Sequence, residues 1–190
     1  MANSMEPIKD INIIEDIADF LRADSPKHGE RNRVMWLMGI YFGLRISKLL
    51  ELKVRDVRNK DIVYLRGNKR NKERKLTIND ELKEIINEYI KDKKDYEYLF
   101  PSQKDPNKPV GRGQCWRKFS QAGAAFNIEK VGTHTLRKTY GYIIYIESGK
   151  DAVAVKEALN LSSVDTALRY IGIIRDQSNQ IMSNMRLLSK

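Results

Sequence analysis

Apolar residues recur every three or four positions along most of this chain, which is the spacing that places one side of an α-helix against a core. Glycine, proline or a polar capping residue separates most of these stretches from the next. The pattern predicts helices over residues 12–21, 30–41, 44–52, 80–92, 114–126, 135–148, 151–159 and 164–170. Trp36, Trp116 and Phe119 are expected to pack inward.

The spacing changes between residues 61 and 78. Ile62–Leu65 and Lys75–Ile78 are rich in residues that favour strands, and the polar segment 66–74 between them predicts a hairpin. The basic residues of this region are Lys69, Arg70, Lys72, Arg74 and Lys75. Such a run is either a solvated loop or a contact to the phosphates of a nucleic acid. The predicted fold class is therefore mainly α with a small antiparallel β-hairpin (α+β).

The length of 190 residues fits one domain with a real core, and no internal repeat divides it. Residues 176–190 form a tail in which Ile181, Met185 and Leu188 recur at helical spacing. This apolar stripe is expected either to fold back on its own domain or to dock on a neighbouring protomer.

The chain is strongly basic. Lys and Arg number 35 against 25 Asp and Glu, which gives a net charge of +10, and the isoelectric point is near 9.6. An anionic polymer is the expected partner. Charge alone leaves two alternatives, a protein that is merely soluble and basic, or a surface that meets anionic lipid.

Several classes of protein do not fit. The longest apolar run, residues 34–44, is broken by Gly39 and Gly43 and is too short to span a bilayer, and no signal peptide precedes it. The single cysteine, Cys115, and two distant histidines supply no metal site. We therefore expect a cytoplasmic protein that uses neither a membrane nor a metal or other cofactor.

The candidate chemistry centres on residues 132–140. His134 and Arg137 are three residues apart, so they share a face if the segment opens a helix, with Thr133 as the expected N-cap. The positive end of a helix beside His and Arg suits a phosphate. Arg45, at the entrance of the helix over residues 44–52, is either a salt-bridged core residue or a group aimed into a cleft.

The order of four features gives a more specific signal. Gly-Leu-Arg-Ile-Ser at 43–47 is followed by the basic hairpin, by His-Thr-Leu-Arg at 134–137 and by Leu-Arg-Tyr-Ile-Gly at 168–172. In this order the chain resembles the catalytic domain of the tyrosine recombinases, the phage integrase and Xer-like family, from about residue 13 to residue 172. The resemblance implies that family's catalytic-domain fold.

The resemblance also implies roles for five residues. Tyr170 would attack a DNA phosphodiester and form a 3′-phosphotyrosyl link, with His134 accepting its proton directly or through the phosphate. Arg45 and Arg137 would hold the non-bridging oxygens. Lys69 would protonate the leaving 5′ oxygen, with Lys72 as the alternative because hairpin loops shift register easily. The reaction would need neither ATP nor a metal.

The implied partner is double-stranded DNA, bound by a homo-oligomer of two to four copies. The residues expected to contact DNA are basic and lie on the hairpin, on the helix over residues 114–126 and beside the motif: Arg70, Lys72, Arg74, Arg112, Arg117, Lys118 and Lys138. The implied process is site-specific recombination in a phage or another mobile element.

The chain departs from the family in two respects. Leu161 stands where the family usually has a His or Trp that donates a hydrogen bond, so we expect slow cleavage unless Asn160 reaches the phosphate. The chain is also expected to lack the N-terminal DNA-clamping domain of the family, leaving one catalytic domain over residues 1–190.

Two alternatives stay open. Leu161 favours a DNA-binding module whose catalysis is weakened or lost, although the other five residues are retained. A type IB topoisomerase would use the same chemistry, but the short hairpin and the sequence at 43–47 favour a recombinase.

Overall fold

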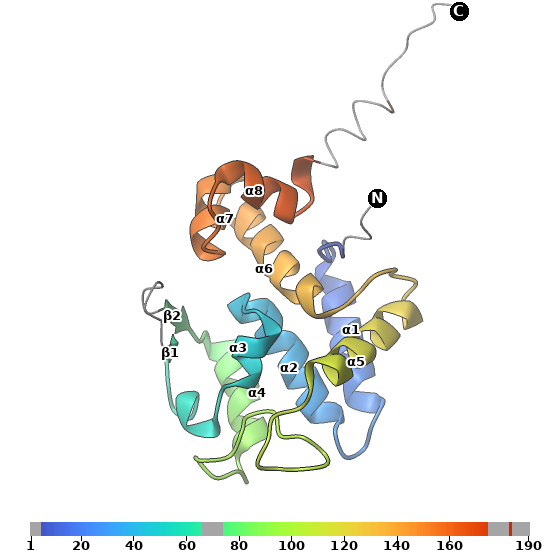
Figure 1. The fold of residues 1–190 in the computed structure, drawn as a ribbon, viewed down its shortest axis with the longest axis vertical. Helices are drawn as coiled ribbons and strands as arrows, with labels where there is room; N and C mark the ends of the chain where they lie inside the picture. Colours follow the sequence, from blue (N-terminus) through green and yellow to red (C-terminus); the bar gives the residue numbers. More distant parts are fainter. Residues whose placement is uncertain (1–4, 66–73, 175–182, 184–190) are drawn as a thin grey trace, which may run out of the picture.

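The computed structural model describes residues 5–65, 74–174 and 183. Eight α-helices and one two-stranded sheet make up this part of the chain (Figure 1). The helices are α1 (Ile11–Ala23), α2 (Gly29–Phe42), α3 (Ile46–Leu50), α4 (Asp80–Ile90), α5 (Arg112–Ala125), α6 (Thr133–Glu147), α7 (Ala152–Ala158) and α8 (Val164–Tyr170). A 3-10 helix, η1 (Val54–Asp56), follows α3. The predicted fold class is confirmed.

The predicted hairpin is also present. Strand β1 (Ile62–Leu65) pairs antiparallel with β2 (Arg74–Thr77), so that Ile62 lies opposite Thr77 and Leu65 lies opposite Arg74. Val63 and Leu76, which face each other, turn into the core while Tyr64 and Lys75 point outward. The hairpin loop, with Lys69, Arg70 and Lys72, lies outside the described residues, as do residues 176–182 and 184–190 of the tail.

The largest core is built around α2. Trp36 and Met38 are fully buried on this helix, and α1, α4, α5 and the first turns of α6 surround it (Figure 1). Helix α2 is apolar on several sides because neighbours cover it all round. We call α1 to α5, the hairpin and the start of α6 the body.

A second and smaller core lies at the far end of α6. Its buried members among the described residues are Val155, Leu159, Ala167 and Ile171. Helices α7 and α8, which we call the C-terminal lobe, pack on each other and on α6 (Figure 1). Gly141 of α6 allows this close approach, since a Cβ there would lie 2.7 Å from Leu159 Cδ1.

Three local predictions were wrong. Trp116 has 48% of its side chain exposed, whereas Trp36 is fully buried as predicted. Helix α5 begins at Arg112, two residues earlier than predicted, and Trp116 lies at its outer side against Gly132. Helix α3 covers only Ile46–Leu50 because the chain after it turns away and Leu52 pairs with Leu99 through a backbone hydrogen bond of 2.9 Å.

No helix within the described parts of the chain has both the length and the apolar character needed to span a membrane.

Candidate active site

The start of α6 presents the predicted histidine and arginine on successive turns. Thr133 is the first helical residue and Gly132 is the N-cap, so the predicted cap was wrong by one position. The Gly132 N–H donates to the hydroxyl of Thr135 at 3.1 Å, which satisfies a backbone donor at the helix start. His134 is exposed, while Arg137 is buried one turn later.

Arg137 joins the body to the C-terminal lobe. Its Nη1 donates to the Gly43 carbonyl at 2.6 Å and its Nη2 to the Leu159 carbonyl at 2.5 Å. These carbonyls lie at the C-terminal ends of α2 and α7, where backbone oxygens lack partners within the helix and carry partial negative charge. Gly43 has a φ of 56°, and a Cβ there would meet the Tyr140 ring at 2.1 Å. Only glycine fits this junction.

Tyr170 ends α8 and is half-buried against the lobe core. The Lys138 ammonium lies 5.3 Å from the centre of its ring. Burial raises the pKa of the Tyr170 phenol, and the charge and hydrogen bond of Arg137, together with the charge of Arg45, oppose that rise. The phenol therefore lies within the electrostatic reach of both predicted phosphate-binding arginines.

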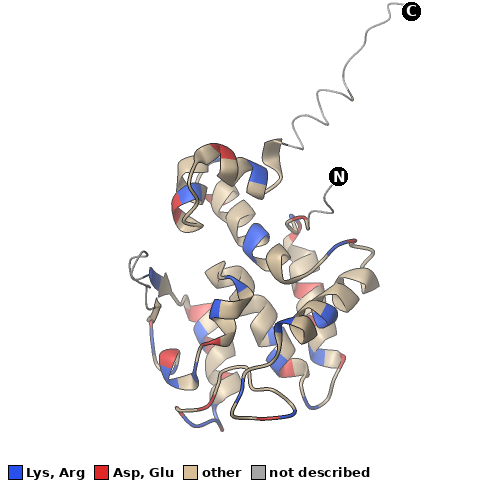
Figure 2. Ribbon diagram, in the orientation of Figure 1, with Lys and Arg blue, Asp and Glu red and all other residues tan. Residues whose placement is uncertain are grey.

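Two further guanidinium groups, those of Arg45 and Arg74, lie near Arg137. Burial lowers the pKa of Arg137, the phenol of Tyr170 raises it, and the positive charges of Arg45 and Arg74 lower it further. Arg45 is exposed on the extended link between α2 and α3. Arg45 precedes α3, Arg137 lies on α6 and Arg74 begins β2. Figure 2 shows Lys and Arg segments in blue beside α3, on α6 and on β2. Like charges gathered at one point favour a bound anion.

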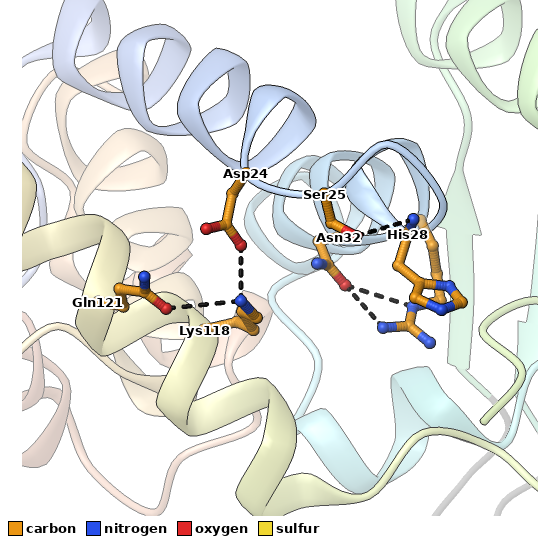
Figure 3. A network of polar contacts seen from close by, with 7 residues as sticks. Asp24, Ser25, His28, Asn32, Lys118 and Gln121 are labelled. Carbon is orange, nitrogen blue, oxygen red and sulfur yellow. Dashed lines mark hydrogen bonds and ion pairs between the residues drawn. The ribbon is translucent and has the colours of Figure 1, made fainter. Parts of the chain in front are cut away.

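The predicted DNA-binding residues have different surroundings. Arg112 and Arg117 are exposed on α5, whereas Lys138 has only 8% of its surface exposed. Lys118 forms an ion pair of 2.6 Å with Asp24 and so ties α5 to the end of α1 (Figure 3). Arg74 donates to the carbonyls of Phe42 at 3.3 Å and Ala158 at 2.7 Å. Its carbonyl contacts could not be predicted, because no sequence pattern brings residues 42, 74 and 158 together.

Leu161 follows α7 in a tight helix ending. The N–H of Leu161 donates to the Lys156 carbonyl at 2.9 Å and that of Asn160 to the Glu157 carbonyl at 3.0 Å. Asn160 adopts the left-handed conformation that this ending requires, with a φ of 47°. Leu161 is partly buried against the lobe core. Its side chain contributes packing and has no hydrogen-bond donor.

Comparison with known proteins gives a consistent set of matches. The model of the phage integrase family matches residues 12–174. The probable integrase/recombinase YoeC of Bacillus subtilis (strain 168) is 40% identical over 172 residues, which are 90% of this chain and 92% of that protein. Tyrosine recombinase XerD of Staphylococcus aureus is 30% identical over 177 residues, 88% of this chain but only 59% of XerD.

A solved structure agrees in fold. The site-specific recombinase XerH, in a post-cleavage complex with its palindromic difH substrate, superposes with a TM-score of 0.70 at 20% identity. The match covers 96% of this chain and 54% of XerH. The chain therefore spans little more than half of the length of XerD and XerH, and nearly all of YoeC.

Proposed function

This chain belongs to the phage integrase family, and we propose that it carries out site-specific DNA recombination by cleaving and rejoining strands through a 3′-phosphotyrosyl intermediate. One observation carries the proposal. The Tyr170 phenol interacts with Arg137 and Arg45, two cations that come from distant parts of the chain. A nucleophile beside two guanidinium groups is the arrangement that attack on a phosphodiester requires.

The proposed cleavage step uses the residues as follows. The Tyr170 oxygen attacks the phosphorus, and a bond to the phosphorus forms as the bond from phosphorus to the 5′ oxygen breaks. A free phenol has a pKa of about 10 and is mostly protonated at neutral pH, so its proton must leave during attack. His134, exposed at the open start of α6, accepts it directly or through the phosphate.

The cations stabilise the charge that develops on the phosphate. Arg45 and Arg137 hold the non-bridging oxygens, because a guanidinium group stays charged and can donate two parallel hydrogen bonds. Arg137 would exchange at least one of its carbonyl partners, Gly43 or Leu159, for phosphate. Lys69, or Lys72 in the same loop, gives the proton to the departing 5′ oxygen.

Rejoining reverses this step. The phosphotyrosyl link retains the energy of the broken phosphodiester, so another 5′ hydroxyl can attack it without ATP. The functional groups assigned above supply a nucleophile, a proton acceptor, a proton donor and cations. We accordingly assign the reaction to these side chains without a metal or other cofactor.

Leu161 makes the enzyme slow. Loss of one donor to the transition state costs about 3 kcal/mol, or about a hundredfold in rate. Leu161 packs against the lobe core, which supports a role in packing alone. The second candidate function is that of a DNA-binding module that has lost cleavage completely.

The proposed partner is double-stranded DNA, bound in the cytoplasm by two to four copies of the chain. Two strands must be cut at each of two sites during an exchange, and each cut occupies one Tyr170 until rejoining releases it. In this assignment residues 1–190 act as one catalytic domain, and the tail over residues 176–190 docks in cis or on a neighbouring copy.

The proposal is tested by trapping the covalent intermediate. A library of nicked duplexes, in which the cut end diffuses away, is incubated with the protein, and DNA bound covalently is recovered and sequenced. We expect a protein–DNA band with wild type and with Tyr145→Phe, a control on α6 that packs against the lobe core, and none with Tyr170→Phe. Absence of the band with wild type, while duplex binding persists, would leave the DNA-binding module as the function. Relaxation of supercoiled DNA without any target sequence would favour a topoisomerase.

A further inference from the structure

Arg74 is the first residue of β2 and was expected to contact DNA, but its hydrogen bonds run to protein. We propose that Arg74 is a positioning residue that fastens the C-terminal lobe to the body and thereby holds Tyr170 in place for attack. This inference rests on the proposed function only in that Tyr170 is taken as the nucleophile. The fastening itself is a separate claim about the fold.

The geometry gives Arg74 two partners in two different cores. One nitrogen, Nη2, donates to Phe42 O at 3.3 Å, at the end of α2, and to Ala158 O at 2.7 Å, at the end of α7. Phe42 belongs to the core of the body, whereas Leu159, next to Ala158, belongs to the core of the lobe. The side chain therefore spans the junction.

Arg74 and Arg137 form a matched pair at this junction. Arg137 donates to Gly43 O and Leu159 O, which are the carbonyls directly after those that Arg74 uses. Both helix ends expose partly negative carbonyls that need donors, and a charged donor strengthens each bond. The two guanidinium groups together satisfy successive carbonyls at the ends of α2 and α7.

Arg74 and Arg137 have different roles when DNA is bound. Arg137 interacts with the Tyr170 phenol and is the proposed phosphate ligand, so its carbonyl bonds compete with substrate. The Arg74 guanidinium instead donates to the carbonyls of Phe42 and Ala158. Its bonds to Phe42 and Ala158 can therefore persist and keep the lobe in register while Arg137 turns to the phosphate.

The position of Arg74 in the chain supports this role. Leu65 pairs with Arg74 at the loop end of the hairpin, directly beside the segment that contains Lys69. From Ala158 the chain reaches Tyr170 through the short turn at Asn160 and through α8. Arg74 thus connects the loop end of the hairpin to the segment that carries the proposed nucleophile.

The test compares three variants with wild type. Arg74→Met keeps the length and removes the donors, Arg74→Lys keeps the charge, and Lys75→Met is the control on the exposed face of the same strand. DNA affinity is titrated at several salt concentrations, and the rate of covalent adduct formation is measured at saturating DNA. A positioning role predicts at least a tenfold lower rate for both Arg74 variants, with affinity and salt dependence within twofold of the control.

A second substrate distinguishes a defect in attack by the nucleophile from a defect in protonation of the leaving group. When sulfur replaces the bridging 5′ oxygen, the departing thiolate needs no proton, so this substrate should restore cleavage to Lys69→Ala. It should not restore the Arg74 variants if they misplace Tyr170. If this substrate restores cleavage by the Arg74 variants, Arg74 assists the leaving group as the hairpin lysine does, and the proposal is overturned. Full activity of Arg74→Lys, together with weaker binding and a shallower salt dependence for Arg74→Met, would make Arg74 a phosphate contact instead.

Hydrogen exchange tests the fastening without any reaction. In Arg74→Met the amides of Leu159, Asn160 and Leu161, which close the end of α7, should exchange at least fivefold faster than in Lys75→Met. Unchanged exchange would overturn the proposal even if the protein is active. Faster exchange in a protein that forms no adduct would retain the fastening and reject only the proposed function.

Discussion

The body and the C-terminal lobe are held together by different forces. The body has a continuous apolar core in which Trp36, Phe42 and Phe119 are almost fully buried. The lobe core has four buried residues in the described chain, and its two helices have seven residues each. Helices of that length are unstable alone in water, so the lobe depends on α6 and on hydrogen bonds from Arg74 and Arg137.

The difference places the proposed nucleophile on the weaker part of the molecule. Tyr170 is carried by α8, whereas Arg45 and His134 are carried by the body. Elements that must move during a reaction commonly have low local stability. Strand exchange in the proposed function requires Tyr170 to engage and release DNA, and a lobe fastened by a few polar contacts can adjust without unfolding the body.

Arg137→Lys should have the largest effect. A lysine ammonium cannot span two carbonyls or grip two phosphate oxygens as a guanidinium group does. We expect adduct formation at saturating DNA to fall by about 10² to 10³, and exchange to quicken in α7 and α8 but not in α2. Arg55→Lys, at an exposed position of η1, is the control. Equal exchange in both variants would show that the lobe is fixed by apolar packing instead.

Truncation of one leucine in each core tests the comparison directly. Leu82 of α4 and Leu159 are both fully buried. Leu82→Ala should lower the free energy of unfolding in urea by about 2–5 kcal/mol, because it leaves a cavity in the main core. Leu159→Ala should mainly speed exchange in the lobe, with a smaller change in global unfolding. The same global loss for both would mean that body and lobe unfold as one unit.

Leu161→His should raise the rate of cleavage, by up to about a hundredfold, because it restores a donor near the phosphate. Single-turnover adduct formation is the measurement. Leu161→Ala, which removes packing without adding a donor, is the control and should be no faster than wild type. A histidine variant no faster than the alanine variant would show that the side chain does not reach the phosphate.

Alkaline titration should show the smallest effect. Burial raises the pKa of Tyr89 in the body and of Tyr170 in the lobe. Arg31 opposes the rise at Tyr89 while Glu30 and Glu97 add to it, whereas Arg137 and Arg45 only oppose the rise at Tyr170. The stability gained by keeping these phenols neutral is present below about pH 10 and is lost as pH rises through their folded values. Tyr170 should ionise first. Subtracting the phenolate absorbance of Tyr170→Phe from that of wild type gives the titration curve of Tyr170, and Tyr89→Phe gives that of Tyr89 in the same way. The two curves show which phenol ionises first.

Much of the fold could be predicted from local pattern. The helices and the hairpin follow from apolar spacing and strand-forming residues, and Ser163 caps α8 through a hydrogen bond of 3.1 Å to Thr166 N. The errors concern the ends of helices and the faces that helices bury. Thr133 was expected to cap α6 and Trp116 to be buried, because a helix boundary and the side it buries depend on what packs beside it.

The candidate site was predicted as a set of residue types in a fixed order. Arg45, His134, Arg137 and Tyr170 were identified by motif, and the structure brings the charges of Arg45 and Arg137 to the Tyr170 phenol. Lys69 lies in the segment outside the described residues, so its role stays a prediction. Lys138 was expected on the DNA-facing surface, but the structure buries it and stacks its ammonium over the Tyr170 ring.

The sequence by itself determined most of the helical segments, the residues that are chemically able to attack or hold a phosphate, and the net charge of +10 that favours an anionic partner. Only the tertiary structure decided that Arg74 and Arg137 would join the ends of α2 and α7. The reason is physical. Apolar spacing and helix caps act between near neighbours, whereas backbone carbonyls look alike in every sequence, and only folding decides which distant guanidinium group reaches them.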